Sequence, residues 1–210
     1  MGGIFSFDSP LMEFLGKAAD VMILSILWLL GCLPVLTVGT STTALYYASM
    51  KAIRDEGRVT ANFFKSYRMN LKQSITAELI LLAVLYIFYI DIQVVLAVEG
   101  TWKALAGGLF GSLFFLFLAF VSYLFPLLSR FVYTYKDWFR NTLLMSLLNL
   151  PITVVILFFN LTPVFLLLWQ PGIFLWMLPF LLFMGPGLIA RVNSLLFLHI
   201  FRKYLPDHTL

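Results

Sequence analysis

Charged residues are scarce in this chain. They make up 11% of its 210 residues, whereas soluble domains carry about 25%. Hydrophobic residues reach 61%. This composition excludes disordered chains, collagen-like repeats and ordinary soluble enzymes. The class that remains is an integral membrane protein, and its length predicts one membrane domain over residues 1–210.

Cysteine and the motifs of common catalytic sites are lacking as well. Cys32 is the single cysteine, so no internal disulfide can form. The sequence contains no GxxxxGK[ST] phosphate loop, no HExxH and no cysteine pair. Its two histidines, His199 and His208, lie near the C-terminus. We therefore expect no catalytic residue, no metal, no cofactor and no enzymatic activity.

Long apolar runs are the main feature that is present. A helix needs about 20 apolar residues to cross a bilayer, and no run alternates apolar with polar residues as a membrane barrel requires. The segment 162–171 is too short to span and predicts a lid along the outer surface. The pattern predicts an all-α, polytopic membrane helix bundle with five transmembrane helices, at residues 20–38, 75–98, 105–128, 143–161 and 172–190.

Lysine and arginine are unevenly distributed between the loops. Twelve of the 14 lie in segments 49–73 and 129–141 and in the tail from residue 191, and the other two are Lys17 and Lys103. Cytoplasmic loops carry such an excess, so we predict an N-terminus outside and a C-terminus inside. The net charge of +4 is thus a topology signal and indicates no nucleic acid partner.

Proline interrupts the helices that run from outside to inside. Pro34, Pro126 and Pro186 lie toward the cytoplasmic ends of their runs, where proline bends or breaks a helix, and a helical extension follows each. Segments 62–65 (Asn-Phe-Phe-Lys) and 137–140 (Asp-Trp-Phe-Arg) both place two aromatics and a cation before the chain re-enters the membrane. A weak internal repeat explains this, and so does the general composition of membrane interfaces.

The segment from residue 34 to 44 is the least generic stretch. Ser and Thr are good N-caps, so we predict that the first span ends or kinks between Leu33 and Gly39, and that a second helix runs from about Thr40 to Asp55. A free helix N-terminus can bind an anion or a sugar hydroxyl, whereas the alternative is that the hydroxyls only pack helices together. The candidate site residues are Gly39 and the hydroxyl residues Thr37, Thr40, Ser41, Thr42 and Thr43.

Ionisable residues inside the apolar runs are the second group of candidates. Glu78 lies at a depth similar to that of Arg130 and Arg191, which predicts an ion pair near the inner face. Asp91 lies well inside the second run, and we expect its carboxyl to meet a polar partner or a cavity. Glu78 and Asp91 are about 140° apart around a helix, which disfavours a proton relay.

Several short motifs follow one another in a characteristic order. They are Trp28-Leu-Leu, Pro34-x-x-Thr37-x-Gly39, Thr43-Ala-Leu-Tyr-Tyr47, Phe63-Phe64-Lys65, Asn70-Leu-Lys-Gln-Ser74 and Trp138-Phe-Arg-Asn-Thr142. This order resembles the YesL-like family of bacterial membrane proteins along nearly the whole chain. The family is a domain of unknown function with no established catalytic residue, and its members are often found beside carbohydrate uptake systems. The resemblance implies a multi-pass protein of a bacterial plasma membrane.

Two functions fit these observations. The first is a non-enzymatic accessory of carbohydrate uptake or sensing, with the lipid bilayer and a sugar ABC permease or another membrane protein as partners. The second is a small-solute transporter or channel that acts on its own, which the interrupted helices, the hydroxyl cluster and Asp91 favour. A membrane-embedded enzyme is least favoured, because no set of polar residues converges.

Overall fold

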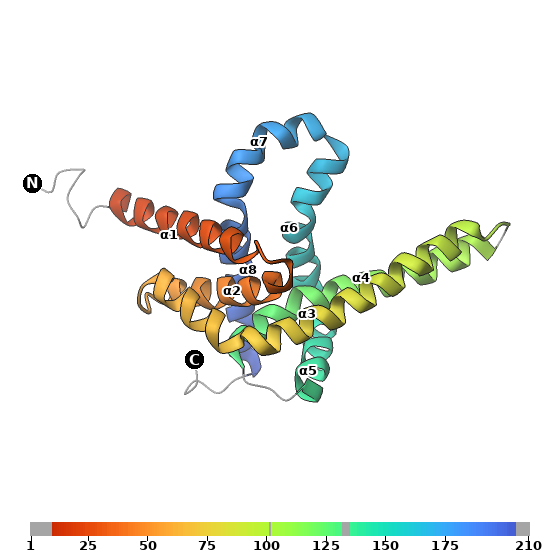
Figure 1. Cartoon of the computed structure of the whole chain (residues 1–210), viewed down its shortest axis with the longest axis horizontal. Helices are drawn as coiled ribbons and strands as arrows, with labels where there is room; N and C mark the ends of the chain where they lie inside the picture. The colour runs from red at the N-terminus through yellow and green to blue at the C-terminus, as the bar shows by residue number, and fades with distance from the viewer. Residues whose placement is uncertain (1–9, 101, 132–134, 205–210) are drawn as a thin grey trace, which may run out of the picture.

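A computed structural model describes residues 10–100, 102–131 and 135–204, and every regular element in these ranges is a helix (Figure 1). This agrees with the predicted all-α class. The elements are α1 (Pro10–Gly31), a 3-10 turn η1 (Val35–Thr37), α2 (Val38–Ile53), α3 (Val59–Ala97), α4 (Trp102–Arg130), α5 (Tyr135–Leu148), α6 (Leu150–Trp169), α7 (Pro171–Phe183) and α8 (Gly185–Tyr204).

Three arms leave a common hub (Figure 1). The arms are α1, the α3–α4 hairpin and the α6–α7 pair, and the hub consists of α2, residues 119–130 of α4, and α8. Aromatic packing holds the hub together, because the ring of Tyr123 meets that of Phe197 edge-on at 4.9 Å between centroids. Phe197 in turn packs against Tyr46 and Phe201, so all three hub segments share one core.

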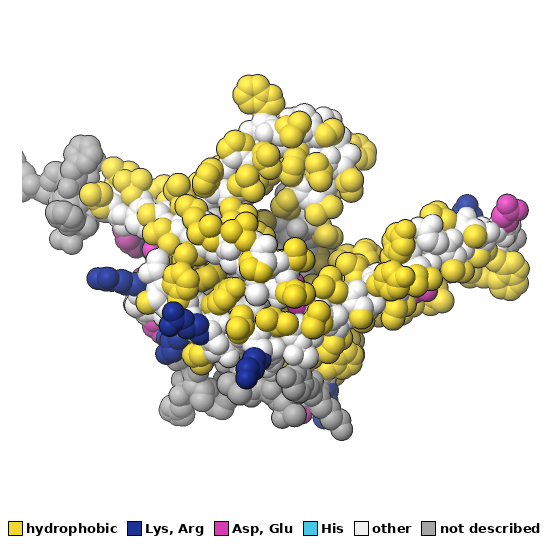
Figure 2. Space-filling model, in the orientation of Figure 1, with side chains coloured by type: hydrophobic (Ala, Val, Ile, Leu, Met, Phe, Trp, Pro, Cys, Tyr) yellow, Lys and Arg dark blue, Asp and Glu magenta, His cyan; other side chains and the backbone are white. Residues whose placement is uncertain are grey.

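The arms are apolar on their outer surfaces (Figure 2). Leu168 and Trp176, for example, are 79% and 89% exposed. Among the described residues, α1, α3, α4 and α6 are long and apolar enough to cross a membrane, and α7 with α8 makes a fifth span if this pair, bent by 69°, counts as one. Burying such surfaces in water-free surroundings is favourable, so the chain is built as a multi-pass membrane protein.

The fourth span differs from its predicted limits. The chain breaks at Asn149, and α6 restarts with Pro151 in its first turn, where proline is tolerated because its missing N–H has no helical partner in any case. The helix then continues to Trp169. The prediction of a lid over residues 162–171 is therefore wrong, because residues 162–169 form roughly the last two turns of α6.

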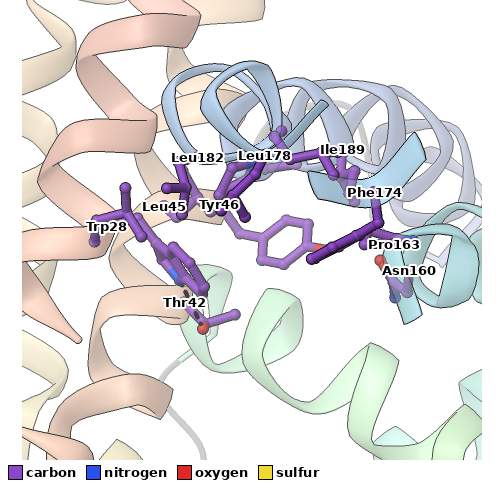
Figure 3. Close-up of a pocket in the computed structure, with 15 residues that line it drawn as sticks. Trp28, Thr42, Leu45, Tyr46, Asn160, Pro163, Phe174, Leu178, Leu182 and Ile189 are labelled. Atoms are coloured by element: carbon purple, nitrogen blue, oxygen red, sulfur yellow. Dashed lines mark hydrogen bonds between the residues drawn. The ribbon is translucent and has the colours of Figure 1, made fainter. Parts of the chain in front are cut away.

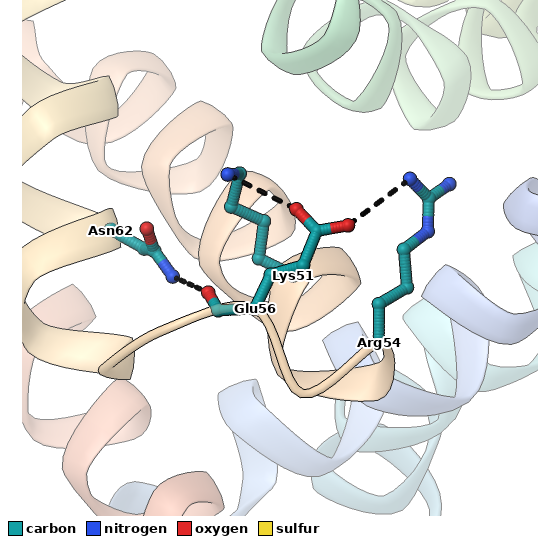
Figure 4. A network of polar contacts seen from close by, with 4 residues as sticks. All are labelled: Lys51, Arg54, Glu56 and Asn62. Carbon is teal, nitrogen blue, oxygen red and sulfur yellow. Dashed lines mark hydrogen bonds and ion pairs between the residues drawn. The ribbon is translucent and has the colours of Figure 1, made fainter. Parts of the chain in front are cut away.

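A tight turn joins α2 to α3. Asp55 and Gly57 have positive φ values of 56° and 74°, and Gly57 adopts this conformation without the steric cost that a side chain adds. The carboxylate of Glu56 pairs with Lys51 Nζ at 3.2 Å and Arg54 Nη1 at 3.8 Å (Figure 4). Asn62 Nδ2 donates to the Glu56 carbonyl at 2.7 Å, which ties the start of α3 back to the turn.

The two aromatic segments of the predicted repeat occupy similar positions. Phe63 is buried at the start of α3 and Phe64 beside it is exposed; Trp138 is buried at the start of α5 and Phe139 beside it is exposed. The helices that follow differ, since α3 continues to Ala97 and α5 ends at Leu148. The similarity is thus confined to the first turns of each helix.

Candidate functional site

The first arm breaks where the proline predicts. After α1 ends at Gly31, Pro34 has an extended backbone (φ −78°, ψ 114°), and α2 begins at Val38. Proline has no N–H to donate to the preceding turn, which favours the break here, although α4 and α6 continue through Pro126 and Pro163. The predicted second helix from about Thr40 to Asp55 is confirmed to within two residues at each end.

Two of the clustered hydroxyls satisfy the end of α1. Thr37 Oγ1 donates to the Gly31 carbonyl at 2.8 Å, and Ser41 Oγ donates to the Trp28 carbonyl at 2.9 Å. The last carbonyls of a helix have no partner within it, and a lipid environment offers none. These hydroxyls therefore stabilise the break.

The remaining hydroxyls lie within α2 and do not cap it with their side chains. Thr42 accepts a hydrogen bond from Trp28 Nε1 at 3.1 Å, and Thr43 shares one with Ser74 of α3, with 3.1 Å between the two oxygens. Thr40 is fully buried and its hydroxyl has no partner among the described residues. The structure thus brings this whole group of candidate residues together at the contact of α1, α2 and α3.

Glu78 supplies the cap of α2 from a distant part of the chain. Its Oε2 accepts from the backbone N–H of Gly39 at 3.0 Å, where the positive end of the helix dipole favours a carboxylate. In the described ranges its partner is this N–H and neither Arg130 nor Arg191, so the predicted ion pair is wrong. Glycine at position 39 also lets the Phe125 ring of α4 pack against α2, because a Cβ there would lie 2.5 Å from this ring.

Ser25 caps α8 in the same manner. Its hydroxyl accepts from the Gly187 N–H at 2.9 Å and donates to the Val21 carbonyl at 2.9 Å. A Cβ on Gly187 would lie 2.3 Å from that carbonyl oxygen, so only glycine allows α1 and α8 to approach this closely. Two hub helices therefore carry in their first turn a glycine whose N–H is satisfied by a side chain of another helix.

The other ionisable candidates lie away from this cluster. Arg130 ends α4 and Arg191 lies in α8, and both are half-buried. Asp91 is exposed on α3, and none of the described residues pairs with it, so the shielding that we predicted is not provided by the chain itself. The reason is the length of α3: its 39 residues extend for roughly 58 Å, which exceeds the ~30 Å apolar core of a bilayer, and Asp91 lies near the C-terminal end of this helix.

A cavity of about 350 Å³ lies beside the break, between α1, α2, α6, α7 and α8 (Figure 3). We call it the α7 cavity, because one face of α7 forms its wall with Phe174, Leu178, Leu181 and Leu182. A second cavity of about 340 Å³ lies between α2, α4 and α6. The two share three lining residues, namely Thr42, Tyr46 and Asn160.

A chain of buried and half-buried polar side chains runs past the two cavities. Asn193 Nδ2 donates to the Tyr46 hydroxyl at 3.1 Å and to Asn160 Oδ1 at 2.8 Å, and Asn160 Nδ2 donates to Ser122 Oγ at 3.2 Å. Sequence reasoning missed this chain. The feature of the sequence that indicates this chain is the presence of Asn160 and Asn193 within apolar segments, where each polar side chain requires a partner.

Comparison with known proteins gives one match. The family described as "Protein of unknown function, DUF624" matches residues 21–92, about a third of the chain. The matched segment includes α2 and both partners of its cap, Gly39 and Glu78. No curated protein and no solved structure matches the chain.

Proposed function

We propose that this protein is a non-enzymatic accessory of a carbohydrate uptake system in a bacterial plasma membrane, and that it belongs to the YesL-like family. The DUF624 match over residues 21–92 supports a family of unknown function, and the long apolar helices support a membrane protein. The carbohydrate link comes from the resemblance of the sequence motifs. In this role the chain binds a sugar ABC permease and changes its activity without moving solute itself.

The topology that goes with this proposal has five spans: α1, α3, α4, α6 and the bent α7–α8 pair. The N-terminus lies outside and the C-terminus inside. The chain breaks beside Pro34 and just before Pro186, whereas the interruption predicted at Pro126 is absent, because α4 continues through this residue as one helix. The placement of charge supports this topology. On the face shown in Figure 2, most of the lysine and arginine side chains lie around the lower left of the hub, while the arms are largely apolar apart from charged groups on the right-hand arm, mainly at its tip.

The exposed apolar surface of the arms is the observation that carries the accessory role. Phe88 of α3 packs against Phe110 and Phe114 of α4, so the hairpin is held together by its own aromatic seam. Leu85 and Tyr86 on the same hairpin remain 46% and 64% exposed. The arm is thus held together by its own packing and is apolar on its outer surface. Such a surface can bind another membrane protein as well as lipid.

The test is reconstitution of a sugar ABC permease in proteoliposomes with and without the full-length chain. The proposal predicts that the chain co-purifies with the permease and changes its rate of ATP-driven sugar uptake. Liposomes with the chain alone should take up no sugar. An unchanged permease rate at saturating amounts of the chain contradicts the proposal.

The two adjoining cavities favour the alternative of a transporter or channel that acts alone. Cavities that meet at Thr42, Tyr46 and Asn160 could form successive halves of a path through the hub. Flux of a small labelled sugar into liposomes that contain only this chain would establish the alternative and refute the accessory role.

A further inference from the structure

The α7 cavity has the size and lining of a small-molecule site. Its volume of about 350 Å³ falls in the range of about 300–1,000 Å³ that ligand pockets occupy. Twelve of its 15 lining residues are apolar or glycine, and they come from five helices. Apolar walls with a few polar groups at one place are typical of sites that take an apolar ligand with one polar end.

Tyr46 provides the polar end of this cavity. The residue is 6% exposed, and its hydroxyl oxygen accepts from Asn193. Figure 3 shows Tyr46 among the residues that line the α7 cavity. Among the described residues no acceptor receives the Tyr46 O–H, so this proton is available to a group bound in the cavity. Asn193 Oδ1, behind Tyr46, is also buried without a partner. A buried donor without an acceptor costs about 1–3 kcal/mol, which an acceptor on a ligand would offset.

The lining restricts the charge of the ligand. None of the 15 lining residues is charged, so an anionic or cationic group would be buried without compensation. A neutral carbonyl is the acceptor that fits. The cavity walls α6 and α7 also expose apolar side chains on their outer surfaces, so membrane lipid is the molecule that surrounds the site at the highest concentration.

We propose that the α7 cavity binds one acyl chain of a membrane lipid, with the ester carbonyl accepting a hydrogen bond from the Tyr46 hydroxyl. Arg54 supports this placement, because it follows the last residue of α2, eight residues after Tyr46 and about 12 Å away along the helix axis, near the other cations of the α2–α3 turn. Lipid esters lie just inside the headgroup layer, where such cations are found. The proposal requires a membrane location and not the accessory role.

The test uses the full-length chain in vesicles of phosphatidylglycerol and phosphatidylethanolamine with a trace of diacyl phospholipid that carries a photoreactive group on its acyl chain. After irradiation, mass spectrometry locates the labelled peptides. We expect labelling of α7 around Leu178 and of α8 around Ile189. Unlabelled diester phospholipid should compete at least fivefold better than its diether analogue, which lacks the carbonyl. Equal competition by the two lipids overturns the ester assignment without any variant.

Two variant pairs sharpen this result. Leu178→Trp fills the cavity and should remove the labelling at Ile189, whereas Leu175→Trp, on the exposed side of α7, should leave it unchanged. Tyr46→Phe should lower labelling about fivefold, as loss of one hydrogen bond predicts, whereas Tyr89→Phe on the exposed α3 arm should not. Each variant is first checked for a monodisperse elution profile.

Three further outcomes overturn the proposal. Equal labelling of Leu178→Trp and Leu175→Trp shows that the label comes from bulk lipid at the protein surface. Unchanged labelling of Tyr46→Phe removes the role of the hydroxyl. Better competition by free fatty acid than by phospholipid shows that the carboxylic acid, and not a lipid ester, is the ligand.

Discussion

At the start of α2, a carboxylate and a glycine depend on each other. Glu78 accepts the Gly39 N–H, and this glycine leaves room for the Phe125 ring. The hydrogen bond matters because a break inside an apolar arm frees backbone groups that lipid cannot satisfy. The role of each residue can be tested by single substitutions in detergent.

Replacement of Glu78 by alanine should destabilise the protein. The Gly39 N–H would be left buried without an acceptor, at a cost of about 1–3 kcal/mol. Glu78→Gln keeps one acceptor oxygen and should cost less. Thermal unfolding in detergent measures both, with Glu99→Ala at the exposed end of the arm as the control. Equal melting temperatures of Glu78→Ala and the control would show that this cap contributes nothing.

Gly39→Ala should also be destabilising, for a steric reason. The new Cβ would lie 2.5 Å from the Phe125 ring, and overpacking of this kind costs about 1–3 kcal/mol. Gly111→Ala is the matched control, because a Cβ there meets nothing within 4 Å. It should be neutral or stabilising by up to about 1 kcal/mol, since alanine favours a helix. A stable Gly39→Ala protein would contradict the close approach of α2 and α4.

Thr40 and Thr43 should respond to valine in opposite directions. Thr40→Val removes a buried hydroxyl that has no partner and should stabilise by about 1 kcal/mol. Thr43→Val breaks the hydrogen bond to Ser74 and should destabilise by about 1 kcal/mol. Differential scanning fluorimetry distinguishes the two. If permease activation falls in Thr40→Val while stability rises, this hydroxyl serves a ligand or partner and does not serve packing.

At the scale of the helix, capping of a first turn by a side chain from another helix occurs twice. The α8 helix begins at a break after α7, and Ser25 of α1 accepts its Gly187 N–H. We predict that Ser25→Ala speeds hydrogen exchange of the first turn of α8 about tenfold, which corresponds to loss of about 1.4 kcal/mol. Ser112→Ala in the exposed arm is the control. Unchanged exchange at Gly187 would show that the N–H is satisfied by another group.

The local sequence predicts where most helices form. It does not predict which distant side chains cap them. The break after Gly31 is readable from Pro34, because a missing N–H and a fixed φ act within one turn. The cap of α2 is not readable, because Glu78 lies 39 residues away and its proximity depends on how α3 packs. The limits of α6 are not readable for a related reason. The predicted span runs through Asn149 because apolar residues lie on both sides of it, so the break there leaves no clear local signal. Pro151 is compatible with a helix start, but a proline alone does not show on which side of it the helix begins.

The whole molecule consists of three apolar arms and one hub, in which polar side chains cap two of the helices. In Figure 1 the outer ends of the arms lie at or above the level of the hub, and α5 lies below it. Seven of the 14 lysine and arginine residues lie in the hub helices or the α2–α3 turn, three more lie in the first half of α3, and two lie in α5. In the proposed topology the arm ends lie outside and the hub loops lie on the cytoplasmic side. The exposed Asp91 then lies toward the outer surface and needs no partner within the chain.

Thiol labelling of intact cells tests this arrangement most directly. In a Cys32→Ser background, single cysteines replace Glu99 at the end of the α3–α4 arm, Gln170 at the α6–α7 turn, and Arg58 in the hub turn, all of which are exposed. A membrane-impermeant maleimide should label Glu99→Cys and Gln170→Cys in intact cells, and Arg58→Cys only after permeabilisation. Labelling of Arg58→Cys in intact cells, or protection of Glu99→Cys, would contradict the account.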